Sequence, residues 1–92
     1  HSKQTEIKML RFGFRTDTHD IERLVERAKE FLADRDLVKF SVRLRGRELA
    51  NKDYAAKKLK GVINSLMDFA EVEEEVKLQG NQYVAIIRPK RS

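Results

Sequence analysis

Hydrophobic and polar residues alternate most regularly in the segment Leu37–Leu49. Because the side chains of an extended strand point alternately to its two faces, this pattern predicts a strand with one apolar and one cationic face. A sheet whose outer face is merely solvated by lysine and arginine would show the same alternation. The apolar face carries Val38, Phe40, Val42 and Leu44, and the polar face carries Lys39, Ser41, Arg43 and Arg45.

A shorter alternating segment, Thr5–Arg11, predicts a first strand whose Ile7 and Met9 point inward. The residues that follow, Phe12–Arg15, form a predicted loop with two aromatic side chains close to arginines. Such side chains can stack on an unpaired base. The interpretation that we favour is that one of the two phenylalanines packs into the core.

Two helices are predicted from apolar residues that recur three or four positions apart. The first begins at Asp17 or Thr18, either of which can cap it, and its apolar stripe runs to Leu32. The second begins near Asn51 or Asp53 and is basic on its outer side. Its apolar face carries Ala55, Leu59, Val62, Ile63 and Leu66.

The last third of the chain predicts a hairpin. Ala70–Gln79 and Gln82–Arg88 read as two strands joined at Gly80-Asn81, residues that tolerate the backbone angles of a tight turn. The final strand is apolar on both faces, which suits a central position in a sheet. Glu73–Glu75 predicts a bulge or an exposed edge, and we expect Pro89–Arg91 to be a flexible basic tail.

The order strand, helix, strand, helix, strand, strand predicts an α+β two-layer sandwich with both helices on one face of a four-stranded sheet. The first two strands should pair in parallel, because a helix connects them. A chain of 92 residues is long enough for one core, so we expect a single domain over residues 3–92. We interpret His1-Ser2 as a tag remnant and the chain as a piece of a longer protein.

Charge is distributed unevenly along the chain, which has a formal net charge of +5 and a pI of about 9.7. Arg35–Lys60 holds nine Lys and Arg against three acids, a local net charge of +6. Asp68–Glu75 holds five acids and no base. Such a polarised molecule can orient itself on a polyanion.

Several classes of function find no support in the composition. There is no cysteine, and no apolar run approaches the length of about 20 residues that a membrane span needs, so we expect a cytoplasmic protein without membrane contact. There is no phosphate-cradling glycine loop and no Ser/His/Asp set. His19 has no histidine partner near it. We therefore expect no cofactor, no metal site and no catalysis.

The most specific candidate site follows the central strand. Gly46 should let the backbone turn sharply, so that Arg45 and Arg47 on either side of it present their guanidinium groups at the end of the strand. Guanidinium groups bind phosphate oxygens through paired hydrogen bonds. The segment therefore predicts a phosphate-binding surface.

These features together resemble the C-terminal domain of bacterial translation initiation factor 3. The closest stretch is Arg43–Leu49, Arg-Leu-Arg-Gly-Arg-Glu-Leu, at the end of the alternating strand. The match extends over nearly the whole chain. It includes Glu6–Met9, the pair His19-Asp20 with Ala28 and Phe31-Leu32, and the ending Ile87–Lys90.

The resemblance implies a mixed sheet with the strand order 1-2-4-3, in agreement with the apolar fourth strand. It also implies a domain that binds the 30S ribosomal subunit through 16S rRNA, prevents its association with the 50S subunit, and supports selection of initiator tRNA and start codon. The family's N-terminal domain and lysine-rich linker are absent from this sequence. We expect the domain to be a monomer.

Carried over residue by residue, the resemblance implies RNA contacts by Arg11, Arg43, Arg45 and Arg47. Four positions that are usually basic in the family are not basic in this chain. They are Glu26 and Glu30 in the first helix, Gly61 in the second and Asn81 in the hairpin. Lys29, beside Glu30, and Lys60, beside Gly61, are the predicted substitutes.

Two other classes of function remain as alternatives. The basic face could instead dock an acidic protein, in which case RNA binding would be incidental. An enzyme acting on RNA is disfavoured, because the sequence offers no metal cluster and no nucleophile paired with a base.

Overall fold

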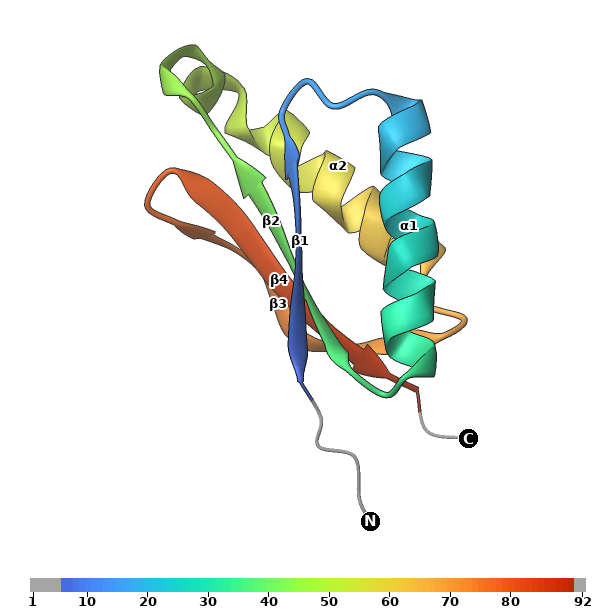
Figure 1. The fold of residues 1–92 in the computed structure, drawn as a ribbon. Helices are drawn as coiled ribbons and strands as arrows, with labels where there is room; N and C mark the ends of the chain where they lie inside the picture. The colour runs from blue at the N-terminus through green and yellow to red at the C-terminus, as the bar shows by residue number, and fades with distance from the viewer. Residues whose placement is uncertain (1–5, 91–92) are drawn as a thin grey trace.

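The computed structural model describes residues 6–90, so residues 1–2 and Thr5 lie outside the described residues. Figure 1 shows a sheet covered on one face by two helices. The predicted α+β two-layer sandwich, its element order and its strand order β1-β2-β4-β3 are confirmed. The elements are β1 (Ile7–Gly13), α1 (Thr18–Ala33), β2 (Leu37–Arg43), the 3₁₀ helix η1 (Gly46–Asn51), α2 (Lys52–Ser65), β3 (Ala70–Gln79) and β4 (Gln82–Pro89).

The sheet is mixed, as expected from its connections. β1 pairs with β2 in parallel, and β4 pairs antiparallel with both β2 and β3. β4 is therefore central, which explains why it is apolar on both faces. β3 is an edge strand, and its pairing with β4 shifts register on both sides of Glu74, as the run of acids predicts.

The core lies between the sheet and the helices. All four apolar residues predicted for the central strand are fully buried, and the predicted apolar stripe of the second helix is buried as well. Asp17 caps α1, because its side chain accepts a hydrogen bond from the Asp20 N–H at 3.0 Å. None of the helices in residues 6–90 combines the length and the apolar character needed to cross a membrane.

The predicted orientation of β1 is wrong. Ile7 and Met9 are 55% and 50% exposed on the open face of the sheet, whereas Leu10 and Phe12 are buried. The strand continues to Gly13, and its register places Leu10 beside Phe40 of β2. Shifting a strand by one residue exchanges its faces, and here the larger aromatic residue determines which face is buried. Phe12 is thus the phenylalanine that packs into the core.

The end of α1 explains how the chain enters β2. The Asp36 N–H donates to the Phe31 carbonyl and the Arg35 N–H to the Leu32 carbonyl, both at 3.0 Å. These bonds form a Schellman motif, whose αL position is Arg35, with φ 68°. Asp36 is buried and accepts the Glu6 N–H at 3.2 Å, which attaches the start of β1 to this turn.

Two local predictions are wrong. Gly46 does not need its conformational freedom: Gly80, at φ 62°, is the one described glycine with positive φ, and a Cβ on Gly46 would meet nothing within 4 Å. The chain turns there through η1 instead. Pro89 is not part of a flexible tail, because it pairs with Ala70, and the Lys90 N–H donates to the Phe69 carbonyl at 3.0 Å. Arg91 lies outside the described residues.

Candidate nucleic-acid interface

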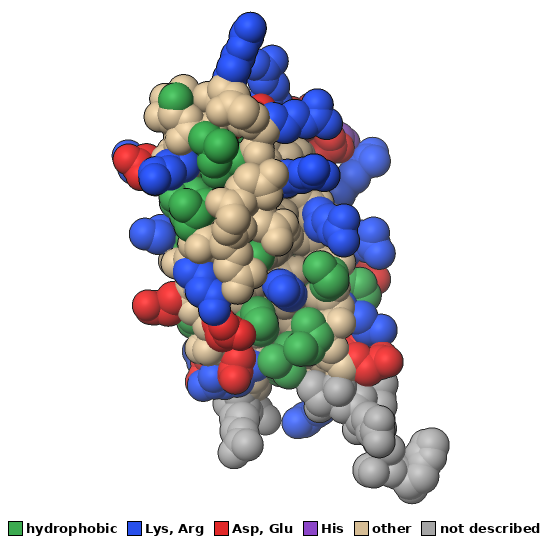
Figure 2. All heavy atoms as spheres, turned by 90° about the vertical axis from the view of Figure 1, so that its left-hand side faces the viewer, with side chains coloured by type: hydrophobic (Ala, Val, Ile, Leu, Met, Phe, Trp, Pro, Cys, Tyr) green, Lys and Arg blue, Asp and Glu red, His purple; other side chains and the backbone are tan. Residues whose placement is uncertain are grey.

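Five arginines meet at the end of the sheet where the parallel strands β1 and β2 terminate. The two loops that follow these strands lie next to each other there, as Figure 1 shows. We call Arg11, Arg15, Arg43, Arg45 and Arg47 the arginine group; all five line one open hollow of about 1030 Å³. In Figure 2, which looks onto the open face of the sheet, blue side chains cluster at the upper end of the molecule.

The positions of these arginines follow from the strand pattern. Arg11 of β1 lies beside Ser41 of β2, and Gly13 lies beside Arg43, so Arg11 and Arg43 share the open face. Ser41 is buried between them and donates to the Gln82 side chain at 2.9 Å, which satisfies its hydroxyl. The face therefore presents guanidinium groups above a well-packed strand.

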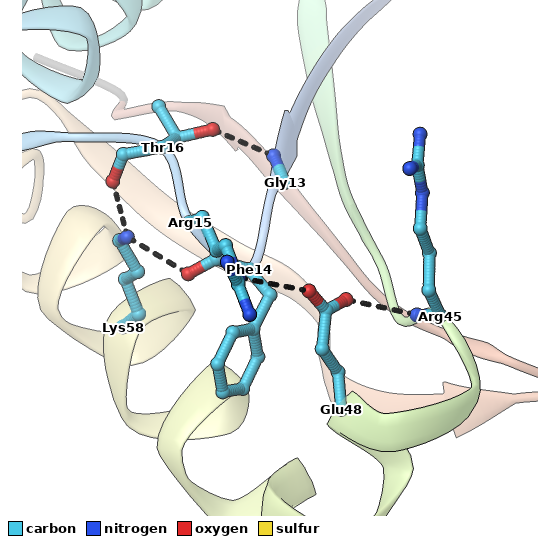
Figure 3. A network of polar contacts seen from close by, with 7 residues as sticks. All are labelled: Gly13, Phe14, Arg15, Thr16, Arg45, Glu48 and Lys58. Carbon is cyan, nitrogen blue, oxygen red and sulfur yellow. Dashed lines mark hydrogen bonds and ion pairs between the residues drawn. The ribbon is translucent and has the colours of Figure 1, made fainter.

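One carboxylate, Glu48, lies among the residues that line this hollow, and it is used internally. Its Oε1 accepts the backbone N–H of Arg45 at 2.9 Å, and its own N–H donates to the Arg45 carbonyl at 2.7 Å. Its Oε2 lies 3.8 Å from Nε of Arg15. Figure 3 shows the Arg45 side chain extending away from Glu48 while the backbone faces it. Glu48 thus connects η1 to the β1–α1 loop.

The β1–α1 loop is held by its own hydrogen bonds and by α2. The Gly13 N–H donates to Thr16 Oγ1 at 2.8 Å, and the Thr16 N–H returns to the Gly13 carbonyl at 3.2 Å. Nζ of Lys58 in α2 donates to the Phe14 carbonyl at 3.2 Å and to the Thr16 carbonyl (Figure 3). Two of the three ammonium hydrogens of Lys58 are therefore committed to the loop.

The arginine group is exposed and lightly paired. Within residues 6–90 its one ion pair is Arg15–Glu48, and the Arg15 side chain is still 87% exposed. An ion pair between exposed groups contributes about 0 to 1 kcal/mol, so it holds the guanidinium only weakly. The group can therefore turn its guanidinium forks towards phosphates at little cost.

The structure brings together four of the predicted RNA contacts and separates two. Arg11, Arg43, Arg45 and Arg47 belong to the arginine group. Lys29 lies near the opposite end of α1, 3.2 Å from Glu26 and 5.2 Å from the centre of the Phe69 ring. Lys60 lies on the side of α2 that faces β3 and shares a hollow with Glu75.

The sequence pattern indicates no role for two residues that the structure places at this end, Tyr54 and Lys58. Their spacing of four puts both on one side of α2. Tyr54 falls outside the apolar stripe of that helix, and an aromatic residue at such a position indicates an exposed ring. The sequence places Arg15 only beside the loop aromatics, because its distance in sequence from Glu48 conceals their contact.

Two acidic residues of β3, Glu71 and Glu73, form ion pairs with Arg88 at the other end of the sheet. Arg88 donates from Nη2 to Glu71 at 2.9 Å and from Nη1 to Glu73 at 2.8 Å. The hydrogen bonds from Glu73 and then Glu71 raise the pKa of the Arg88 guanidinium above its ordinary value. Across residues 6–90 no group of three or more His, Cys, Asp or Glu side chains could hold a metal ion.

Comparison with known proteins places the chain in a family. Residues 5–90 match the family described as "Translation initiation factor IF-3, C-terminal domain". Proteins named "Translation initiation factor IF-3" are similar to it: that of Aquifex aeolicus is 39% identical over 88 residues, that of Acaryochloris marina 36% over 87, and that of Neisseria meningitidis 37% over 91.

The matches cover 96%, 95% and 99% of this chain but 50%, 49% and 53% of those proteins. The chain thus spans about half the length of the curated relatives that it matches. The match nevertheless includes every described strand and helix. The chain belongs to the family of translation initiation factor IF-3 C-terminal domains.

Proposed function

We propose that this domain acts in translation initiation by binding the 30S ribosomal subunit through 16S rRNA. The arginine group contacts phosphates there, and the bound domain occupies a surface that the 50S subunit must reach. It thereby prevents association of the subunits and supports selection of initiator tRNA and start codon. This function belongs in the cytoplasm and requires no cofactor and no bond chemistry.

The observation that carries the proposal is the convergence of the arginine group on one hollow. Five exposed guanidinium groups, from β1, β2 and the segments that follow these strands, lie around a single carboxylate, which is itself bound to the backbone. Phosphate contacts fix the position of a protein on RNA without reading its sequence, and folded RNA is recognised largely by shape. The family membership of the chain supports the ribosome as the source of that RNA.

The test is binding of the labelled domain to purified 30S subunits across a salt series, with 50S subunits added in a second set. We expect saturable binding to 30S and reduced formation of 70S particles. Each lost phosphate contact lowers the slope of log affinity against log salt by about 0.7 to 0.9. A variant with Arg43→Ala, Arg45→Ala and Arg47→Ala should therefore lose about 2 to 3 from that slope.

The matched control removes three exposed cations outside the arginine group: Arg23→Ala, Arg27→Ala and Lys90→Ala. It has the same net charge as the arginine variant, and its slope should stay close to that of the unmodified domain. An unchanged slope in the arginine variant would contradict the proposed contacts. Equal binding to 30S, 50S and heparin would contradict the ribosomal function and favour an acidic protein partner.

A further inference from the structure

A second hollow, of about 610 Å³, lies beside the arginine group. Phe14, Arg15 and Thr16 line both hollows, so the two adjoin the same β1–α1 loop. The far wall of the second hollow is formed by Tyr54 and Lys58 of α2. We call it the Tyr54 hollow.

Tyr54 presents a fixed aromatic surface there. Tyr54 is 54% exposed, although the neighbouring Ala55 is fully buried in the core. Its ring packs against Phe14, with the ring centres 5.0 Å apart and the planes tilted by 54°. Nζ of Lys58 lies 5.8 Å from the ring centre while it holds the loop carbonyls. The Tyr54 ring therefore contacts Phe14 and Lys58, and about half of the residue remains accessible to solvent.

The polar groups of the Tyr54 hollow suit a neutral ring better than a phosphate. Asp17 lies in its wall, and a carboxylate repels a phosphate. Thr18 and Asn51 supply a hydroxyl and an amide, which can bond the polar edge of a nucleobase. Two cationic side chains, Arg15 and Lys58, also line this hollow, but Nζ of Lys58 already donates to two loop carbonyls and Arg15 is shared with the hollow of the arginine group.

We propose that the Tyr54 hollow receives one unpaired base of the bound RNA, which stacks on the Tyr54 ring. The phosphates on either side of that base contact Arg15 and the neighbouring arginines. This inference rests on the proposed function and adds to it a selectivity for RNA with an unpaired nucleotide. Aromatic stacking accepts any base, so the preference concerns the unpaired state and not the sequence.

The test compares two fluorescent RNA hairpins that are identical except for one unpaired 2-aminopurine in the stem. The domain should bind the hairpin with the unpaired base about tenfold more tightly, which is within the range for stacking one base on an aromatic side chain. Binding should also quench the 2-aminopurine fluorescence. Tyr54→Leu should abolish both effects, whereas Tyr54→Phe should keep both.

The matched control is Phe69→Leu at the opposite end of the molecule. Phe69 is 49% exposed and has a lysine, Lys29, over its ring at 5.2 Å, so it reproduces the aromatic and cationic features of Tyr54. This variant should keep the preference and the quenching. Thermal unfolding of each variant, followed by circular dichroism, identifies any loss of fold.

Two failures can be told apart. If the arginine variant binds both hairpins as tightly as the unmodified domain does, the proposed phosphate contacts are wrong. If binding depends on the arginines but the two hairpins bind equally, or Tyr54→Leu keeps the preference, the inference about the Tyr54 hollow is overturned while the proposed function stands.

Discussion

At the scale of one residue, Glu48 has a role in the structure that its charge alone does not indicate. From the sequence it is one of three acids in a strongly basic segment, and it reduces the local positive charge. In the structure its side chain is only 15% exposed and accepts the Arg45 N–H at the start of η1. A carboxylate in this position stabilises the first turn of a helix, and here it holds the backbone from which Arg45 and Arg47 extend.

Two substitutions separate the charge of Glu48 from its hydrogen bond. Glu48→Gln keeps a carbonyl oxygen that can accept the Arg45 N–H but removes a negative charge from the hollow, so affinity for RNA should rise. Glu48→Ala removes the bond as well, and loss of such a cap lowers the free energy of unfolding by about 1 kcal/mol. Urea unfolding and RNA titration at one salt concentration measure both effects. Equal free energies of unfolding for the two variants would show that the hydrogen bond from the Arg45 N–H to Glu48 does not stabilise the start of η1.

At the scale of elements, β2 and β1 mark the limits of what could be predicted. The alternation in β2 is unambiguous, and all four predicted core residues are fully buried. In β1, either Ile7 and Met9 or Leu10 and Phe12 could lie on the buried face of the sheet, because the sequence alone does not say where the strand ends. The structure resolves this choice through pairing with β2, a contact between segments about 30 residues apart.

The orientation of β1 can be checked with two adjacent residues. Leu10→Ala removes a buried side chain and should lower the free energy of unfolding by about 2 to 5 kcal/mol. Met9→Ala changes a half-exposed side chain and should cost about 0.5 kcal/mol or less. Urea unfolding of both variants provides the comparison. A larger cost at Met9 than at Leu10 would support the orientation predicted from the sequence.

The same limit applies to the candidate site. Arg43, Arg45 and Arg47 could be grouped from the sequence because they lie within five positions of one another. Arg15 and Tyr54 belong to other segments, and only the pairing of β1 with β2 and the packing of α2 bring them to the same end of the molecule. Contacts at such sequence separations have no signature in the local pattern.

At the scale of the whole molecule, the arginine group and the ion-paired acids Glu71 and Glu73 lie at opposite ends of the sheet. The arginine group surrounds the ends of β1 and β2, whereas Arg88 binds Glu71 and Glu73 near the end of β4. A phosphate surface attracts the first end and not the second. The molecule should therefore approach RNA with the ends of β1 and β2 leading.

This orientation makes a prediction about Lys29 and Lys60, which lie away from the arginine group. Removing Arg43 and Arg45 together should lower the salt slope of 30S binding by about 1.4 to 1.8. Removing Lys29 and Lys60 together changes the net charge equally but should lower the slope by less than about 0.7, the value for one contact. Ion pairing with Glu26 already offsets part of the charge of Lys29. If the two double variants lose the same slope, the RNA surface must extend along both helices, and the domain then binds on its long side rather than by its arginine end.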